Sequence, residues 1–357
     1  MINIAHGNLL KADVDALVNT VNTSGVMGKG IALQFKRAYP QAYATYRNAC
    51  EAGEVNVGAM HVVDLGALGG GPRWIINFPT KRHWKSKSKI EDIRAGLTAL
   101  RETLKELGIR SIAVPPLGCG NGGLAWSTVE PLICAELGDL DGVRVELYSP
   151  DGAPSAEEMP NKTQKPAMTT GMAAVAALVG NYKRGLMEPF VRLVEVHKLM
   201  YFLQEAGEPL RLNYNKGSYG PYATNLRHVL NRMESHYITG FGDGQEKPTQ
   251  VIDLIEGAED AAIHFLEGQL ATYARMERVA HLIEGFEDPF GMELLGSVHW
   301  VMMENPEAAR DSKAAVPLVR NWNDRKARLM REEHIEKAWV RLKDHRWDLE
   351  SRSALNT

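Results

Sequence analysis

The spacing of apolar residues changes once along this chain, and that change limits the folds that the chain can adopt. In the first half, short apolar runs alternate with segments whose apolar residues recur at helical spacing. From residue 172 onward, helical spacing dominates. Residues 149–166 between the halves are rich in Pro, Ser, Gly and charge. The pattern predicts an α/β domain over residues 1–150, a linker over 151–170 and a mainly α-helical domain over 171–357.

The alternating half predicts an α/β sheet sandwiched between helices. Its expected strands are Ile2 to Ala5, Asp15 to Asn19, Met60 to Leu65, Arg73 to Phe78, Ser111 to Val114 and Val143 to Tyr148. Its expected helices are Gly30 to Arg37, Tyr39 to Ala52, Lys89 to Leu107 and Ser127 to Leu137. The helices expected in the second half are Pro189 to Glu205, Tyr222 to Ser235, Asp260 to Glu284, Pro289 to Glu304 and Arg325 to Leu342.

Composition narrows the possible function classes. With 357 residues, 44% of them apolar, the chain can bury a full core in each of two domains. A formal net charge of −3 provides no overall attraction to nucleic acid, so any DNA contact must be local. No apolar run reaches membrane-spanning length, and the first residues lack the features of a signal peptide. Three cysteines without a close pair indicate a cytoplasmic protein without a structural zinc site, and no cofactor is expected.

A strand is expected to pass into a helix at Asn19-Thr-Val-Asn22 and the following Met27-Gly-Lys-Gly-Ile31. Glycines at positions 25, 28 and 30 let the backbone approach a ligand closely, and free amides at a helix N-terminus favour phosphate. The alternative is a plain glycine-rich turn without a ligand. Two more loops of this kind follow expected strands, at Gly7-Asn8 and at residues 115–123. Because ligands of α/β sheets bind at the carboxyl ends of strands, the three loops can converge on one cleft.

These loops together resemble the macrodomain family, which binds ADP-ribose. The matching segments are Gly7-Asn8-Leu9, Val18-Asn-Thr-Val-Asn22, Gly28-Lys-Gly30 and Leu117-Gly-Cys-Gly120, and the resemblance covers roughly residues 1–150. It implies a mixed sheet sandwiched by helices. It also implies an ADP-ribose site made of Asn8, Leu9, Thr20, Val21, Asn22, Met27, Gly28, Lys29, Gly30, Ile31, Thr80, Leu117, Gly118, Cys119, Gly120, Asn121 and Gly122.

The resemblance assigns a part of the ligand to each loop. The loops around Gly28 and Gly118 are expected to clamp the diphosphate, and Asn22 is expected to bind the distal ribose. Asn8 and Leu9 are expected at the adenine end, although many macrodomains carry Asp where this chain has Asn8. Lys29 either binds phosphate directly or points to solvent, because the backbone amides alone would serve.

The segment after Asn77-Phe-Pro-Thr80 is basic and reads Lys81-Arg-His-Trp-Lys-Ser-Lys-Ser-Lys89. For Arg82, Lys85, Lys87 and Lys89 we favour a solvated basic loop or a patch for DNA phosphate. Lys81 differs from these residues because it directly follows an expected strand. Partial desolvation or neighbouring cations would lower its pKa and make the neutral amine available as a nucleophile. Asn-Phe-Pro-Thr-Lys81 resembles a branch of macrodomains that remove terminal ADP-ribose, which implies Lys81 as the catalytic residue.

The same branch pairs its lysine with an aspartate in the glycine loop, and this chain departs from that pattern. Its loop reads Gly118-Cys-Gly-Asn-Gly122, and Gly122 takes the matching position. The acid and base steps would therefore fall to Lys81, to water, to the substrate or to His83, which is otherwise an exposed loop histidine. Cys119 could act as a nucleophile, but packing beneath the loop is the simpler interpretation.

Two pieces of the second half resemble the Panacea domain, an antitoxin module. They are His197-Lys-Leu-Met-Tyr-Phe-Leu-Gln204 and Asn215-Lys-Gly-Ser-Tyr-Gly-Pro-Tyr222. Their structural interpretation is a core helix, followed by a loop that Gly220-Pro221 ends at the start of the next helix. Acidic clusters at residues 256–260 and 284–288 could face a protein partner, or could be ordinary solvated helix faces.

The order of the two domains resembles the family of DarG-type bacterial DNA ADP-ribosyl glycohydrolase antitoxins. This resemblance implies ADP-ribosylated DNA, single-stranded, as the substrate of Lys81. It also implies that residues 171–357 bind and neutralise a DarT-like toxin. The alternative is a catalytically silent ADP-ribose reader that neutralises the toxin by binding only.

Overall fold

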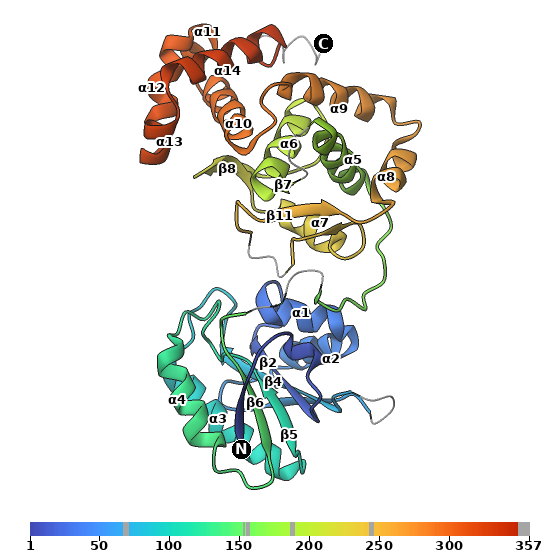
Figure 1. Ribbon diagram of the computed structural model, residues 1–357, viewed down its shortest axis with the longest axis vertical. Coiled ribbons are helices and arrows are strands. Elements are labelled where there is room, and N and C mark those ends of the chain that lie inside the picture. The colour runs from blue at the N-terminus through green and yellow to red at the C-terminus, as the bar shows by residue number, and fades with distance from the viewer. Residues whose placement is uncertain (67–70, 153, 155–157, 186–189, 243–245, 349–357) are drawn as a thin grey trace. The chain divides into compact units, whose positions relative to one another are not determined.

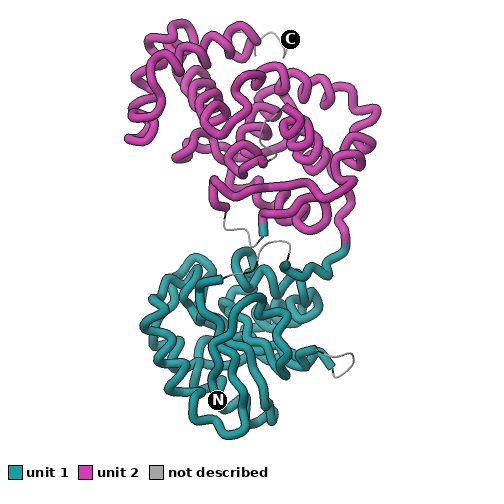
Figure 2. The backbone as a smooth tube through the Cα atoms, in the orientation of Figure 1, with its two compact units in different colours: residues 1–164, 242–245 teal, residues 165–241, 246–357 magenta. Residues whose placement is uncertain are grey.

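The computed structural model describes residues 1–66, 71–152, 154, 158–185, 190–242 and 246–348, which form two units. The first unit comprises residues 1–164 with 242–245, and the second comprises residues 165–241 with 246–357 (Figure 2). Each unit has its own apolar core. Among the described residues, no helix is long and apolar enough to cross a membrane.

A six-stranded mixed sheet forms the centre of the first unit (Figure 1). The strands lie in the order β1-β6-β5-β2-β4-β3. Within the described sheet, β3 runs antiparallel to β4, and the other neighbouring pairs are parallel. The strands are β1 (Ile2–Ala5), β2 (Ala16–Asn22), β3 (His61–Asp64), β4 (Trp74–Lys81), β5 (Ser111–Val114) and β6 (Arg144–Tyr148).

Helices cover both faces of this sheet. On β4, Ile76 and Phe78 pack into one core with α3 and α4, whereas Ile75 packs into another core with Phe35 of α1. Successive residues of a strand point to opposite faces, so an almost continuous apolar run is needed to fill both layers. The predicted α/β sandwich is confirmed. The helices are α1 (Gly30–Ala38), α2 (Pro40–Glu51), α3 (Ile90–Glu106) and α4 (Trp126–Leu137).

One glycine allows α3 to lie close against the sheet. A Cβ atom added at Gly96 would lie 2.2 Å from the ring of Phe78, so no larger residue fits there without movement. This contact fixes α3 over β4 and, with it, the segment that joins the end of β4 to the start of α3.

Two strands run further than their apolar residues predict. The strand expected at 15–19 extends to Asn22 in β2, and the strand expected at 73–78 extends to Lys81 in β4. The polar ends stay in the sheet because they pair with each other, and Asn22 lies opposite Lys81 after an irregularity in the register at Val21. The apolar pattern stops before these residues, so it underestimates the strands at the end where a ligand would bind.

The described end of the predicted linker is attached to the first unit. Asn8 Nδ2 donates to the backbone oxygen of Glu158 at 2.8 Å, and the Lys162 amide donates to the Arg37 oxygen at 2.9 Å. These contacts hold residues 158–162 beside Asn8 and the end of α1. The flexible coil expected over 151–170 is therefore shorter than the composition indicates.

The second unit is mainly helical, as predicted, with short strands between the helices (Figure 1). A three-stranded sheet has the order β10-β11-β7, and β8 pairs with β9 as a hairpin. The strands are β7 (Val191–Arg192), β8 (Tyr214–Gly217), β9 (Gly220–Ala223), β10 (Ile238–Thr239) and β11 (Val251–Leu254). The helices are α5 (Thr170–Gly185), α6 (Leu193–Glu205), α7 (Leu226–Met233), α8 (Ala258–Leu266), α9 (Leu270–Ile283), α10 (Pro289–Glu304), α11 (Pro306–Arg310), α12 (Ser312–Arg320), α13 (Asp324–Leu329) and α14 (Glu332–Asp344).

Several predicted helices of this unit are wrong in extent. The helix expected from Tyr222 begins only at Leu226, because Gly220 and Pro221 belong to strand β9 rather than to a helix N-terminus. The helix expected over 260–284 is divided at Gly268, which has a left-handed φ of +84°. The helix expected over 325–342 is divided near Met330, and Pro189, expected to begin another helix, lies outside the described residues.

Candidate functional site

The ends of β2 and β4 form the floor of the candidate site. Asn22 lies opposite Lys81 in the sheet. Thr80 Oγ1 donates to the Val21 oxygen at 3.3 Å, and the Thr23 amide donates to the Lys81 oxygen at 3.2 Å. These contacts hold the backbone of Lys81 from the neighbouring strand, while its side chain extends beyond the end of the sheet.

Lys81 has the environment of a chemically tuned amine. Its side chain is partly buried, and Nζ donates to the backbone oxygen of Asn121 at 3.2 Å. Burial and the neighbouring Lys87 cation lower the pKa of Lys81, because both disfavour the charged form. The sequence did not indicate that Lys87, rather than Lys85 or Lys89, would affect Lys81, because all three belong to the same alternating Lys-Ser series. Only the folded structure shows that Lys87 is the neighbouring cation.

The glycine loop after β5 is closely packed on its inner side. Gly118 has a φ of +71°, which favours glycine, and the Ser88 amide donates to the Gly122 oxygen at 3.0 Å. A Cβ atom at Gly122 would lie 2.3 Å from both the Gly118 oxygen and Ser88 Oγ. Gly122, which is expected to match the acid of the resembling branch, therefore has no room for a side chain. Ser88 is a second residue that the sequence did not indicate.

The loop before α1 meets the glycine loop at Asn121. Gly30 begins α1 with a φ of +63°, and a Cβ atom there would lie 3.1 Å from Asn121 Nδ2. Gly28 and Lys29 precede this point, and Lys29 is the N-cap residue without a side-chain capping bond. The first amides of α1 have no acceptor within the helix, so this end carries partial positive charge. Lys81 and the two loops expected to hold diphosphate are thus gathered around Asn121.

Asn22 holds its own loop closed. Its Nδ2 donates to the Val26 oxygen at 2.6 Å, and its Oδ1 accepts from the amide and hydroxyl of Ser24 at 3.0 and 2.7 Å. The expected hydrogen bond from Asn22 to the distal ribose stays a prediction, and it would compete with these contacts.

Asn8 is likewise engaged. Its Oδ1 accepts from the Leu10 amide at 3.0 Å as the cap of a short 3₁₀ helix, Leu9–Lys11, and its Nδ2 donates to Glu158. The contact expected with adenine also stays a prediction.

Several of the expected ligand residues are buried. They are Leu9, Val21, Met27, Thr80 and Leu117, and their contact with ADP-ribose stays a prediction. Thr20 and Ile31 are partly buried, and Gly120 faces open space.

Cys119 lies in the glycine loop but lacks the features of a nucleophile. Its Sγ contacts the Leu117 oxygen at 3.6 Å, and burial raises the pKa of the thiol to about 11. The thiolate is the reactive form of cysteine, and this environment disfavours it.

The basic segment that follows Lys81 is ordered at both ends. Arg82 forms an ion pair with Asp92 of α3 at 3.0 Å. His83 is exposed, its ring lies 5.6 Å from that of Trp84, and its Nδ1 accepts from the Lys85 amide at 3.3 Å. In this arrangement the imidazole contacts the turn rather than Lys81. Among the described residues, no cluster of His, Cys, Asp and Glu is arranged to hold a metal ion.

In the second unit, the two pieces that resemble an antitoxin module meet around Lys198. This lysine of α6 is fully buried, and Nζ donates to the Pro221 oxygen of β9 at 2.9 Å. Burial, with the Lys326 cation next in importance, lowers the pKa of Lys198 to about 7. Glu293 of α10 lies between the cations, with Arg325 Nη1 2.6 Å from its Oε1 and Lys326 also paired to it.

The hairpin β8–β9 is also attached to residues near the end of the chain. Trp322 Nε1 donates to the Gly217 oxygen at 2.9 Å, and Asn323 Nδ2 donates to the Ser218 oxygen at 3.0 Å. Together with Lys198, these bonds make the hairpin a fixed part of the unit.

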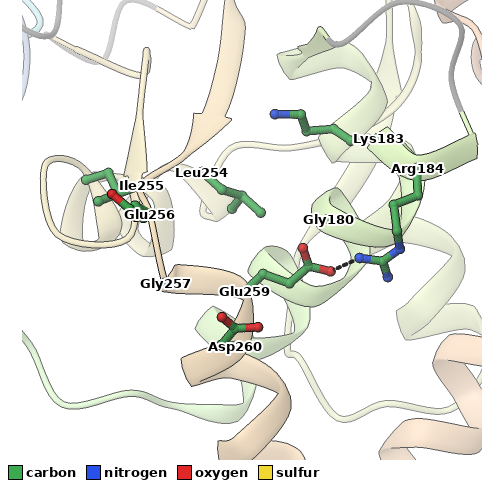
Figure 3. A pocket seen from close by; sticks show the side chains of 9 residues that line it. All are labelled: Gly180, Lys183, Arg184, Leu254, Ile255, Glu256, Gly257, Glu259 and Asp260. Atoms are coloured by element: carbon green, nitrogen blue, oxygen red, sulfur yellow. Dashed lines mark hydrogen bonds and ion pairs between the residues drawn. The ribbon is translucent and has the colours of Figure 1, made fainter.

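An open pocket of about 390 Å³ lies between the end of α5 and the start of α8 (Figure 3). It is lined by Lys183 and Arg184 on one side and by Glu256, Glu259 and Asp260 on the other, and the Glu259 carboxylate is paired with Arg184. The acidic cluster expected at 256–260 is therefore partly neutralised by Arg184 of α5.

Comparison with known proteins gives the following matches. Residues 18–133 match the Macro domain family model. The chain is 47% identical to a DNA ADP-ribosyl glycohydrolase of Thermus aquaticus over 92% of its own length and 89% of that protein. It is 43% identical to a DNA ADP-ribosyl glycohydrolase of Mycobacterium tuberculosis over 96% of its own length and 99% of that protein. A DNA ADP-ribosyl transferase-DNA ADP-ribosyl glycohydrolase fusion protein of Thermosipho africanus is 37% identical over 42% of each chain.

Proposed function

The chain belongs to the DNA ADP-ribosyl glycohydrolase family, and we propose that its first unit removes ADP-ribose from a DNA base with Lys81 as the catalytic residue. The observation that carries this proposal is the position of Lys81. Its amine stands where the sheet ends, 3.2 Å from the Asn121 oxygen, beside the two loops that would hold diphosphate.

The lowered pKa of Lys81 supports a nucleophilic role. Burial and the Lys87 charge increase the fraction of neutral amine, which has the lone pair needed for attack. In the proposed step, Nζ forms a bond to the anomeric carbon while the glycosidic bond breaks and its electron pair leaves with the base. The proton lost from Nζ neutralises the base. Water then cleaves the bond between lysine and ribose and restores the amine. A role in protonating the leaving base is the alternative for the same residue.

We assign the diphosphate to the first amides of α1 and to the glycine loop. The N-terminal end of a helix favours anions, and Gly30 and Asn121 bring the two loops together there. Side chains need not contribute, because main-chain amides of both loops suffice. Most of the rate enhancement would then come from positioning the ribose against Lys81.

The lack of space at Gly122 supports a reaction without an aspartate partner. The Gly118 oxygen and Ser88 Oγ occupy the position that such a side chain would need. Proton transfers would therefore use water, the substrate or Lys81 itself.

The test is release of ADP-ribose from an ADP-ribosylated single-stranded oligonucleotide by the wild type and by Lys81→Ala. Affinity for free ADP-ribose is measured on both proteins. Loss of release with retained affinity is the expected result. Release by the variant at the wild-type rate would refute the catalytic assignment. Tight binding without release by either protein would favour the alternative, a reader domain.

We propose that the second unit binds a DarT-like toxin and that the protein acts as an antitoxin in the cytoplasm. The fusion protein of Thermosipho africanus supports this context, because its name joins a transferase and a glycohydrolase in one chain. The fixed hairpin β8–β9 supports a binding role, because it gives the unit a rigid surface. The free thiols of Cys50, Cys119 and Cys134 agree with a reducing compartment.

Co-purification tests the toxin-binding role. A tagged, inactive toxin is expected to retain the full chain but not residues 1–164, while that truncated protein still binds ADP-ribose. Equal retention of both proteins would refute toxin binding by the second unit.

A further inference from the structure

The turn that follows Lys81 exposes an aromatic ring beside the candidate site. The Ser86 amide donates to the His83 oxygen at 2.9 Å, so Trp84 and Lys85 form the corner of a tight turn. Trp84 is 41% exposed. A tryptophan has a large apolar surface with a flat π face, the kind of surface on which a nucleic-acid base stacks.

This turn is anchored to both loops of the site. At its start, Thr23 Oγ1 donates to the Arg82 oxygen at 2.9 Å, and Arg82 is paired with Asp92. At its end, the Ser88 amide donates to the Gly122 oxygen at 3.0 Å. Trp84 is therefore held at a defined place between the loop after β2 and the glycine loop. Trp84 is the third residue after Lys81, so the Cα atoms of the two residues are within about 11 Å of each other.

The charges around the ring suit a nucleic-acid backbone. Residues 81–89 contain five lysine or arginine residues and no acidic residue, although the whole chain has a net charge of −3. Lys85 Nζ lies 4.9 Å from the centre of the Trp84 ring, and the side chains of both Lys85 and Lys87 are exposed. Proteins that hold single-stranded nucleic acid combine an aromatic face for a base with nearby cations for phosphates.

We propose that Trp84 stacks on an unpaired base next to the ADP-ribosylated nucleotide, while Lys85 contacts the adjoining phosphate. The turn at residues 83–86 would thus select a single DNA strand over an isolated nucleotide. This inference rests on the proposed function, and it adds that the protein also binds the DNA strand next to the ADP-ribosylated nucleotide. Trp84 is a substrate-binding residue in this proposal, and the reacting carbon stays at Lys81.

The test compares two substrates that differ only outside the modified nucleotide. One is an ADP-ribosylated single-stranded oligonucleotide, and the other is the same ADP-ribosylated nucleotide alone. For Trp84→Ala, kcat/KM is expected to fall by about 5- to 150-fold on the oligonucleotide and to change less than about twofold on the nucleotide. Trp84→Phe keeps a ring and is expected to retain most of the activity. Ser86→Ala, in the same turn, is the matched control and is expected to match the wild type.

Binding of the unmodified oligonucleotide makes the inference independent of catalysis. Its affinity is measured by fluorescence anisotropy at several salt concentrations. Trp84→Ala is expected to weaken binding several-fold, and Lys85→Ala is expected to lower the salt slope by about one.

Two outcomes would overturn the inference. One is equal loss by Trp84→Ala on both substrates, which would make the turn a support for Lys81. The other is unchanged oligonucleotide binding by Trp84→Ala. Failure of the wild type to release ADP-ribose from either substrate would instead refute the proposed function, and the anisotropy result would still decide this inference.

Discussion

Two lysines, one in each unit, both have a lowered pKa but differ in how far a substrate can reach them. Lys81 and Lys198 both donate to a backbone oxygen, at 3.2 and 2.9 Å, and burial lowers the pKa of each. Lys81 stands at the end of a strand among open loops, whereas Lys198 is enclosed by α6, β9 and α10. A lowered lysine pKa therefore does not by itself indicate chemistry. A nucleophile also needs a path to its substrate, and only Lys81 of these two has one.

The largest effect on ADP-ribose release is expected from replacing Lys81 by arginine, which keeps the positive charge but has no amine that can attack. Lys81→Arg should lower ADP-ribose release by about 10³-fold, because the guanidinium stays protonated and cannot attack. Affinity for ADP-ribose should change little. Steady-state release and calorimetric binding measure the two quantities. Lys105→Arg, at an exposed lysine near the end of α3, is the control, and a rate within tenfold of the wild type for Lys81→Arg would mean that the charge alone suffices.

Removing the enclosed lysine should affect folding rather than catalysis. Lys198→Ala should lower the free energy of unfolding of the second unit by about 3 kcal/mol, because it leaves a cavity and an unpaired Pro221 oxygen. Denaturant titration measures this change. The exposed Lys313→Ala in α12 should stay within about 0.5 kcal/mol of the wild type. If Lys198→Ala lost ADP-ribose release under conditions where it is fully folded, Lys198 would also be needed for catalysis, and the distinction between the two lysines would be wrong.

The glycine loop around Lys81 should tolerate a methyl group at one position and not at another. Gly122→Ala should destabilise the first unit by about 2 kcal/mol, because its Cβ would lie 2.3 Å from the Gly118 oxygen. Gly120→Ala meets nothing within 4 Å and should leave thermal unfolding unchanged. Equal unfolding temperatures for the two variants would show that the loop adapts.

The pH dependence of stability should report on Lys198. Between the folded pKa of about 7 and the usual value of 10.5, the unfolded chain binds a proton that the folded chain lacks. Stability should therefore rise with pH over this interval, by up to about 1.4 kcal/mol per pH unit. Lys198→Met should flatten this rise in unfolding experiments. An unchanged slope in the variant would assign the rise to other groups.

The smallest effect is expected from the cation beside Lys81. Lys87→Ala should raise the pKa of Lys81, although burial, the larger cause of its lowering, remains. If the neutral amine attacks, the ascending limb of the rate profile should move to higher pH by less than about one unit. Release at pH 7 should then fall a few-fold. As the control, Lys85→Ala should leave the ascending limb of the pH–rate profile at the same pH when the substrate is a mononucleotide. If Lys87→Ala moved this limb to lower pH, that result would contradict attack by a neutral Lys81 amine.

The sequence predicted the sheet of the first unit because buried strands need continuous apolar runs. It missed the ends of β2 and β4, where Asn22 and Lys81 pair with each other although neither is apolar. The contacts of Lys87 and Ser88 could not be predicted, because a repeating Lys-Ser series does not indicate which residue will face Lys81. In the second unit, Gly220-Pro221 looked like a helix start but belongs to strand β9, because Lys198 and Trp322 bind its hairpin from distant parts of the chain.

The hydrogen bonds that hold this hairpin can form only after a later part of the chain has been synthesised. Trp322 and Asn323 follow their acceptors, Gly217 and Ser218, by 105 residues. At about 5–20 residues per second, a ribosome needs roughly 5 to 20 s to supply them after the hairpin has been made. By then residues 1–164 have long been translated. A newly made copy therefore has the whole chain of its candidate site before the hairpin of its second unit can be fixed.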